Sequence, residues 1–196
     1  VCVYIPGGII HRGYAMRGFE SYLKDLYKRP EALQRMMDKL CDFWCDNATE
    51  MIKAAGPENV DIIYFGEDLG TQDSCMFDPG TIYAEYMKPR HRRMIETVKG
   101  LTNNKAKVCY HCCGSAYHFI PHLLDVGIDA LNPVQVTAKN MEPERLKEEF
   151  GDRLTFWGGI NTQETLPFGT PEEVVEETKR IISILGKGGG YILNSV

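Results

Sequence analysis

A histidine and two adjacent cysteines, His111-Cys112-Cys113, follow the β-rich run 107–110. In extended backbone alternate side chains point the same way, so His111 and Cys113 are expected to share one face and Cys112 to take the other. An imidazole nitrogen and a thiolate sulfur on one face are suitable ligands for Zn²⁺. We therefore predict that a His111 ring nitrogen and the Cys113 sulfur lie within about 4 Å of each other. A buried histidine and a buried cysteine that bind no metal are the alternative.

Two neighbouring carboxylates, Glu67 and Asp68, stand where the apolar run 61–65 ends. Only one of two successive side chains can point inward. Neighbouring carboxylates shift each other's pKa and serve as general acids or bases. We therefore predict that Glu67 or Asp68 is catalytic, and that it completes or orients the metal site. The alternative is a carboxylate that fixes the loop or caps a helix.

Cationic and phenolic residues gather after the first apolar run, where His11, Arg12, Tyr14 and Arg17 follow one another closely. Such a mixture suits an anionic substrate, so His11, Arg12 and Arg17 are predicted to bind substrate. A solvated loop is the alternative.

Two further pairs have the i, i+4 spacing of one helix face. His118 and His122 are not followed by the glutamate of an H-E-x-x-H motif, so we expect surface or capping residues. Cys41 and Cys45 lie in a helical run and are expected to be packing residues.

The elements that must position these residues alternate between short apolar runs and helical runs. Strands are expected near 1–5, 60–65, 107–111, 128–132, 155–158 and 190–194, each but the last followed by helix. Short, apolar, non-alternating strands are typical of a parallel sheet covered by helices. A (β/α)8 TIM barrel and a doubly wound sheet both fit. No G-x-G-x-x-G opens a helix after a strand, which favours the barrel.

A barrel also explains where the polar residues fall, because TIM barrels carry their chemistry at the C-terminal ends of the strands. Asn132, Gln135 and Asn161 follow later strands and are predicted to bind substrate. A full barrel has about 250 residues. The 196 residues and six expected strands therefore predict a single partial barrel domain over 1–196, lacking its first one or two strands and a segment after the last.

Local signals set the expected boundaries. We expect a loop from the first strand to Gly18, a helix over 20–27 and a long helix from Pro30. Pro89 predicts a kink or two separate helices. Helix N-caps are expected at Asp78, Ser115 and Thr170, the last with the spacing of a capping box.

The composition is that of a globular protein, with 43% hydrophobic and 25% charged residues and a formal net charge of -5. The negative balance disfavours a nucleic-acid surface and an anionic membrane surface. No run approaches the ~20 apolar residues of a membrane span. Seven cysteines, an odd number, fit a reduced, cytoplasmic protein better than a disulfide framework.

Several motifs, in order along the chain, resemble the uroporphyrinogen decarboxylase superfamily. They are Y-A-M-R-G-F-E (14–20), G-E-D-L-G-T-Q (66–72), H-C-C-G (111–114), G-I-D-A-L-N-P-V-Q (127–135), F-W-G-G-I-N-T-Q (156–163) and G-G-Y-I-L (189–193). The resemblance covers almost the whole chain and implies the last two-thirds of a (β/α)8 barrel.

The superfamily holds two well-defined activities. True decarboxylases remove acetate carboxyls from uroporphyrinogen without a cofactor, and Tyr14 falls where they keep an active-site tyrosine. Cobalamin-dependent methyltransferases use zinc to activate a thiol that takes a methyl group from a corrinoid protein. The H-x-C-G stretch resembles the methyltransferases, whose zinc ligands include the residues that match His111 and Cys113. Their later cysteine ligand would fall at or just beyond Val196, and an acidic residue frequent in the superfamily is replaced near Gln135.

The resemblance thus implies a zinc-dependent, corrinoid-linked methyltransferase, with a corrinoid protein as partner and methyl donor and a small molecule as acceptor. The alternatives are a decarboxylase, whose rate would come from Tyr14, Asp68, Arg12 and Arg17, and a non-catalytic binding homologue. Association into a homo-oligomer stays open.

Overall fold

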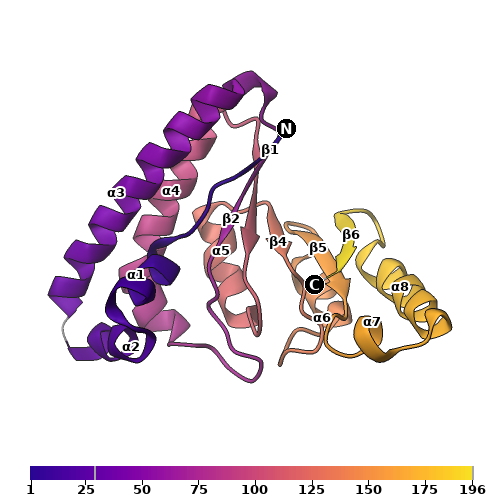
Figure 1. Cartoon of the computed structure of the whole chain (residues 1–196). Helices are drawn as coiled ribbons and strands as arrows, with labels where there is room; N and C mark the ends of the chain where they lie inside the picture. Colours follow the sequence, from indigo (N-terminus) through magenta and orange to yellow (C-terminus); the bar gives the residue numbers. More distant parts are fainter. Residues whose placement is uncertain (29, 196) are drawn as a thin grey trace.

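Six parallel strands form one sheet in the order of the sequence, as the computed structural model of residues 1–28 and 30–195 shows (Figure 1). The strands are β1 (Cys2–Tyr4), β2 (Ile62–Gly66), β3 (Lys107–His111), β4 (Ala130–Asn132), β5 (Thr155–Ile160) and β6 (Tyr191–Ser195). The sheet curls into a half-barrel, which agrees with part of a TIM barrel. The strand positions and the parallel pairing confirm the sequence-based prediction.

Helices follow each strand except the last. They are α1 (Ile9–Arg17), α2 (Phe19–Lys28), α3 (Pro30–Ala55), the 3₁₀ turn η1 (Pro57–Asn59), the π-helix η2 (Pro79–Met87), α4 (Lys88–Leu101), the 3₁₀ turn η3 (Tyr117–Phe119), α5 (Ile120–Val126), α6 (Pro143–Phe150), α7 (Thr165–Phe168) and α8 (Pro171–Leu185). None of the helices that the structure describes has the length and apolar character to cross a membrane.

Strand alternation separates the two faces of the sheet. On β2, Ile63 and Phe65 are fully buried beneath the helices, whereas Ile62, Tyr64 and Gly66 lie half-buried on the opposite, concave face. The same parity on β3 buries Val108 and Tyr110 on the helix side. The core is therefore continuous between the sheet and its covering helices. Cys41 and Cys45 belong to this core as buried free thiols, as expected.

Proline 89 divides one helical run into two elements, which confirms the predicted break. The run begins as η2 with Asp78 as its N-cap, whose carboxylate accepts from the Thr81 N–H at 2.6 Å. It continues as α4 from Lys88. Pro89 is the second residue of α4, in the first helical turn, where a missing N–H costs no intrahelical hydrogen bond.

Helix α1 occupies residues 9–17 of the segment between β1 and Gly18, so the predicted loop is correct for residues 5–8 and wrong for the rest. Its N-terminus is anchored from far along the chain. The Glu67 carboxylate accepts hydrogen bonds from the backbone N–H groups of Ile10 and His11, the latter at 3.1 Å. Since the anchor is distant in sequence, no local pattern signals the start of this helix.

Ser115 does not cap the helix that follows β3, so that expectation is also wrong. Its hydroxyl donates to the carbonyl of Lys139 at 2.7 Å, and the helical run starts later with η3. Thr170 does cap α8 with the predicted capping box, in which its hydroxyl accepts from the Glu173 N–H.

Ion pairs gather at the N-terminal ends of the strands. The Asp129 carboxylate accepts from Lys99 at 2.9 Å and from the Val108 N–H at 2.8 Å. Asp61 pairs with Lys105 at 3.1 Å. Charge at this end of the sheet therefore ties strands and helix ends together.

Candidate metal centre

Three side chains converge where β2 and β3 end. The His111 Nε2 and Cys113 Sγ atoms are 3.4 Å apart, and these two residues and Asp68 each offer one ligand atom within 4.8 Å of the others. Cys112 faces the other way, fully buried, and accepts from the Leu69 N–H at 3.4 Å. The predicted parity and the predicted separation of less than about 4 Å are thus confirmed.

The spacing of these atoms fits a tetrahedral zinc ion. Bonds of about 2.0–2.1 Å to nitrogen and about 2.3 Å to sulfur, at a tetrahedral angle, would place the two ligand atoms about 3.5 Å apart. His111 and Cys113 have nearly this separation already. Nitrogen, sulfur and carboxylate oxygen are also the donors that zinc takes in proteins. The place for the further ligand, at or after Val196, lies outside the described residues.

Asp68 is held in position by two neighbours. Its Oδ1 accepts from the Cys113 N–H at 2.9 Å, and its Oδ2 lies 3.5 Å from His11 Nε2. The His11 hydrogen bond, and then the Cys113 N–H, lower the pKa of Asp68 despite its partial burial. The same carboxylate raises the pKa of His11. Asp68 is therefore an anion at the cluster at neutral pH.

The Cys113 thiol lies half-buried beside this anion. Burial, and then the negative charge of Asp68, raise its pKa to about 11. The site thus disfavours a second negative charge unless a cation is bound there. Thiolate is the form that binds a metal.

His111 is held by two partners through its other ring nitrogen. Nδ1 lies 2.8 Å from Tyr64 Oη and 2.8 Å from Asn132 Oδ1. The Tyr64 hydroxyl donates to the same Asn132 oxygen at 2.6 Å. Burial raises the pKa of Tyr64 to about 12, so the phenol stays protonated.

Glu67 points away from this cluster into the helix layer, fully buried. Its Oε2 lies 2.8 Å from His91 Nε2, and His91 Nδ1 lies 3.0 Å from the Tyr83 hydroxyl. Gly8 leaves room for this carboxylate, because a Cβ there would lie 2.2 Å from Glu67 Cδ. Of the two neighbouring carboxylates, Asp68 lies with His111 and Cys113, whereas Glu67 anchors α1.

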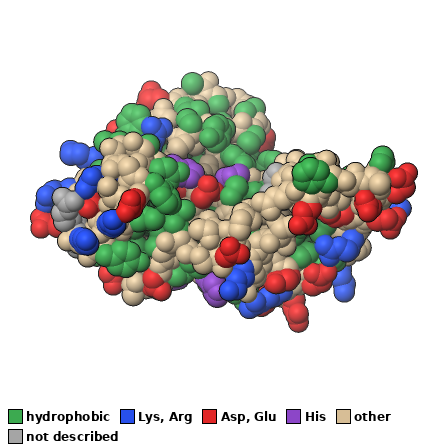
Figure 2. All heavy atoms as spheres, turned by 60° about the horizontal axis from the view of Figure 1, so that its bottom comes forward, with side chains coloured by type: hydrophobic (Ala, Val, Ile, Leu, Met, Phe, Trp, Pro, Cys, Tyr) green, Lys and Arg blue, Asp and Glu red, His purple; other side chains and the backbone are tan. Residues whose placement is uncertain are grey.

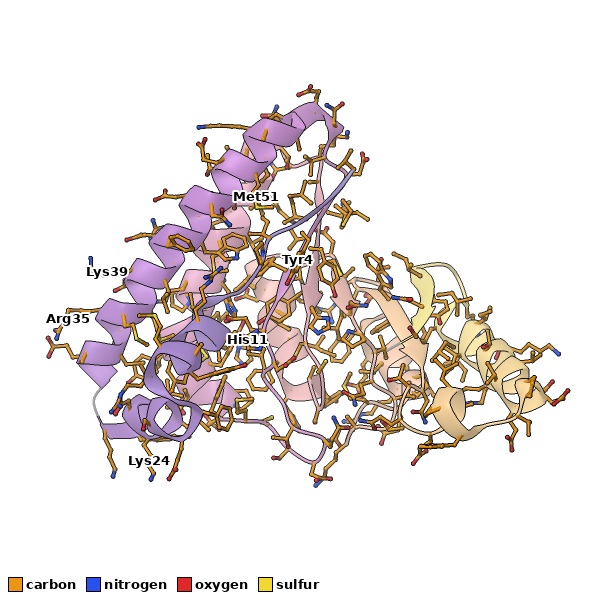
Figure 3. The ribbon with its side chains drawn as sticks, viewed as in Figure 1. Tyr4, His11, Lys24, Arg35, Lys39 and Met51 are labelled. Atoms are coloured by element: carbon orange, nitrogen blue, oxygen red, sulfur yellow. The ribbon has the colours of Figure 1, made fainter. Side chains whose placement is uncertain are left out.

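A cavity of about 280 Å³ opens beside His111 at the C-terminal ends of the strands. It is lined by Tyr4, Gly7, His11, Tyr64, Gly66 and His111. This end of the sheet faces the viewer in Figure 2, where histidine side chains lie near the middle with an acidic side chain beside them. Tyr4 and His11 lie close to the sheet in Figure 3, whereas Lys24 and Arg35 point away from it. Tyr14 packs edge-on against His11 with ring centroids 5.4 Å apart.

The two arginines of this region lie elsewhere. Arg12 donates to the Pro6 carbonyl at 3.1 Å and covers the Phe43 ring. Arg17 pairs with Asp25 at 2.7 Å. Neither lines the cavity.

Gln135 and Asn161 organise loops rather than the cavity. Gln135 accepts from the Gly114 N–H at 2.7 Å, which holds the turn after Cys113. Asn161 accepts from the Gln163 and Glu164 N–H groups in the turn before α7. Asn132 is the one polar strand-end residue of the three that contacts a cluster member.

Two residues of this region, Tyr64 and His91, were not among the sequence-based candidates. Tyr64 shares the strand parity of Gly66 and carries a polar group on the concave face, so alternation along β2 could have indicated it. His91 lies in α4 and meets Glu67 only through tertiary packing, for which the sequence carries no local signal.

Comparison with known proteins places this chain in a family. A model of the uroporphyrinogen decarboxylase (URO-D) family matches residues 8–195. Uroporphyrinogen decarboxylase of Proteus mirabilis (strain HI4320) is 22% identical over 182 residues, which make up 93% of this chain and 47% of that protein. A methyltransferase structure from Methanosarcina mazei has a TM-score of 0.73 and 18% identity, covering 96% of this chain and 50% of that one. The chain therefore spans about half the length of these two proteins and belongs to the uroporphyrinogen decarboxylase family.

Proposed function

We propose that the protein is a zinc-dependent methyltransferase that moves a methyl group from a methylcorrinoid partner protein to a thiol acceptor. The observation that carries the proposal is the convergence of Asp68, His111 and Cys113, with the nitrogen and sulfur already 3.4 Å apart. The corrinoid donor comes from the resemblance of the H-x-C-G stretch to the methyltransferases of the family.

Each residue of the cluster has a part that its surroundings support. His111 Nε2 and Cys113 Sγ would hold the ion, and Asp68 would supply a carboxylate oxygen or hold a bound water. When bound, zinc would lower the pKa of an acceptor thiol so that it is a thiolate near neutral pH. The acceptor would lie in the cavity beside His111, where His11 also contributes to the wall and Tyr14 packs against His11.

Metal stoichiometry tests the proposal directly. Purified protein should hold about one zinc ion per chain by elemental analysis after dialysis. Cys113→Ala and His111→Ala should lose it. Cys112→Ala is the matched control, since the neighbouring thiol faces the helix layer, and it should keep the ion. Zinc retained by Cys113→Ala as in the wild type would reject the site.

Turnover distinguishes the proposed reaction from decarboxylation. Demethylation of methylcobalamin by an added thiol should require zinc and stop on chelation. A decarboxylase would instead consume porphyrinogen after chelation. Arg12 and Arg17, which would bind carboxylates in that alternative, contact Phe43 and Asp25 rather than the cavity.

A further inference from the structure

We infer that Asn132 is a positioning residue that fixes the tautomer of His111, so that Nε2 presents a lone pair to the metal cluster. The inference rests on the proposed function for its purpose, although the tautomer itself can be measured without metal.

The register of the sheet brings His111 and Asn132 together. His111 and Asn132 are partners on the neighbouring strands β3 and β4, so their side chains stand side by side on the concave face. Tyr64 reaches the same point from β2. Three adjacent strands therefore meet at one ring nitrogen.

The orientation of the Asn132 amide is fixed by a hydrogen bond to β5. Its Nδ2 donates to the backbone carbonyl of Trp157 on β5 at 3.1 Å. The reversed amide would set an oxygen against that carbonyl. Because Asn132 is only 5% exposed, water cannot relieve such a clash, and Oδ1 must face His111.

The contacts of Asn132 Oδ1 determine which ring nitrogen of His111 carries the hydrogen. Asn132 Oδ1 has two donors within reach, the Tyr64 hydroxyl at 2.6 Å and His111 Nδ1 at 2.8 Å. An amide oxygen can accept both. If Nδ1 carried no hydrogen, its lone pair would face the lone pairs of Oδ1 at 2.8 Å, and Tyr64 could not relieve the clash because its single hydroxyl hydrogen is donated to Oδ1. The arrangement therefore requires a hydrogen on Nδ1.

A hydrogen on Nδ1 determines what His111 offers to the other members of the cluster. A neutral imidazole with hydrogen on Nδ1 leaves a lone pair on Nε2. That nitrogen lies 3.4 Å from Cys113 Sγ. The ligand atom is thus prepared before any ion arrives, as in metal sites where a ligating histidine donates its other N–H to an outer oxygen.

Nuclear magnetic resonance of metal-free protein tests the tautomer. Two-bond ¹H–¹⁵N spectra of ¹⁵N-histidine-labelled protein at about pH 8, where a typical imidazole is neutral, should show His111 with hydrogen on Nδ1. The His111→Gln variant identifies its signals. Asn132→Leu, of similar shape but without an acceptor, should shift His111 toward the Nε2–H form. Asn132→Asp restores an acceptor and should restore the tautomer. Hydrogen on Nε2 in the wild type, or no change in Asn132→Leu, would overturn the inference.

Measurements of metal affinity are a second test of the role of Asn132. Asn132→Leu should bind Zn²⁺ or Co²⁺ about 10- to 100-fold more weakly than the wild type, and Asn132→Asp should recover most of the loss. Tyr64→Phe keeps Asn132 Oδ1 as acceptor and should lose less. Equal affinities for wild type and Asn132→Leu would overturn the role of Asn132 at the metal. A wild type that binds no metal would reject the proposed function instead, and the tautomer measurement would still decide the inference.

Discussion

At the scale of single residues, the Cys113 thiol determines how metal binding depends on pH. Its pKa is raised to about 11, so the thiol is protonated at neutral pH and must lose its proton when it binds a metal. Between about pH 7.5 and about pH 9 the thiol is still protonated, and each zinc ion bound displaces its proton, so the apparent zinc affinity should rise about tenfold per pH unit. Competition titrations at several pH values measure this slope.

Calorimetry in two buffers with different ionisation enthalpies gives an independent measure of the same proton. About one proton should be released per zinc bound, in the wild type and in Cys112→Ala alike. A release near zero would mean that Cys113 is already a thiolate without metal.

Gly66 is a second residue whose replacement has a definite cost. It pairs with His111 across β2 and β3, and a Cβ on it would lie 2.0 Å from the His111 carbonyl oxygen. Gly66→Ala must therefore displace the backbone of His111, which we propose as a zinc ligand. We expect a loss of about 1–3 kcal/mol or more in unfolding free energy, together with weaker zinc binding.

Gly100 provides the matched control for that substitution. It lies in α4 with no heavy atom within 4 Å of an added Cβ. Gly100→Ala should leave stability unchanged or raise it by about 0.4–1 kcal/mol. Denaturant titration compares the two variants. A Gly66→Ala protein as stable as Gly100→Ala would show that β3 tolerates the extra carbon.

Part of the site could be predicted at this scale. Strand alternation was sufficient to place His111 and Cys113 together and Cys112 apart. Alternation could not choose between Glu67 and Asp68, because the backbone leaves β2 at that point and tertiary partners decide. Arg12 and Arg17 could not be assigned either, since their partners Phe43 and Asp25 lie on α3 and α2.

At the scale of elements, the attachment of α1 to the sheet depends on Glu67. Glu67→Ala would leave the His91 ring and the N–H groups of Ile10 and His11 without their acceptor in a fully buried place. We expect a loss of about 3 kcal/mol in unfolding free energy. Glu67→Gln keeps an acceptor oxygen and should lose less. Urea denaturation measures both.

Glu50→Ala is the control for the loss of a glutamate, since Glu50 is exposed and pairs with Lys53 on the same helix. Its effect should stay within about 0.5 kcal/mol. If Glu67→Ala were equally mild, α1 would be held by its apolar contacts alone.

Element boundaries were predictable wherever the signal is local. Pro89 announces the change from η2 to α4, and Thr170 with Glu173 announces α8. The start of α1 was missed because its anchor, Glu67, lies far along the chain. Ser115 has the residue type of a cap, but the Lys139 carbonyl takes its hydroxyl.

At the scale of the whole molecule, the predicted single domain implies one cooperative unfolding transition. The two tryptophans report on different parts of the sheet: Trp44 on α3 packs against Phe65 of β2 with ring centroids 4.8 Å apart, whereas Trp157 is on β5. Trp44→Phe and Trp157→Phe each leave one reporter. Within each variant, fluorescence and far-ultraviolet circular dichroism should give coincident urea transitions. Separate midpoints would divide the chain into two units.

The half-barrel was predictable because the sequence alternates strand and helix and lacks a dinucleotide-binding turn. What could not be predicted is the set of contacts that bridge strands, such as Asn132 to Trp157 between β4 and β5. These depend on register, which becomes known only when the strands are assembled.

The two ends of the strands carry different kinds of residues. Asp68, His111 and Cys113 lie at the C-terminal rim, whereas the ion pairs of Asp129 and Asp61 lie at the N-terminal rim. Substitution of the paired charges is therefore expected to affect the stability of the chain and to leave the arrangement of Asp68, His111 and Cys113 as it is. Because the two groups of residues lie at opposite ends of the strands, substitutions that change stability and substitutions that change the cluster can occur independently.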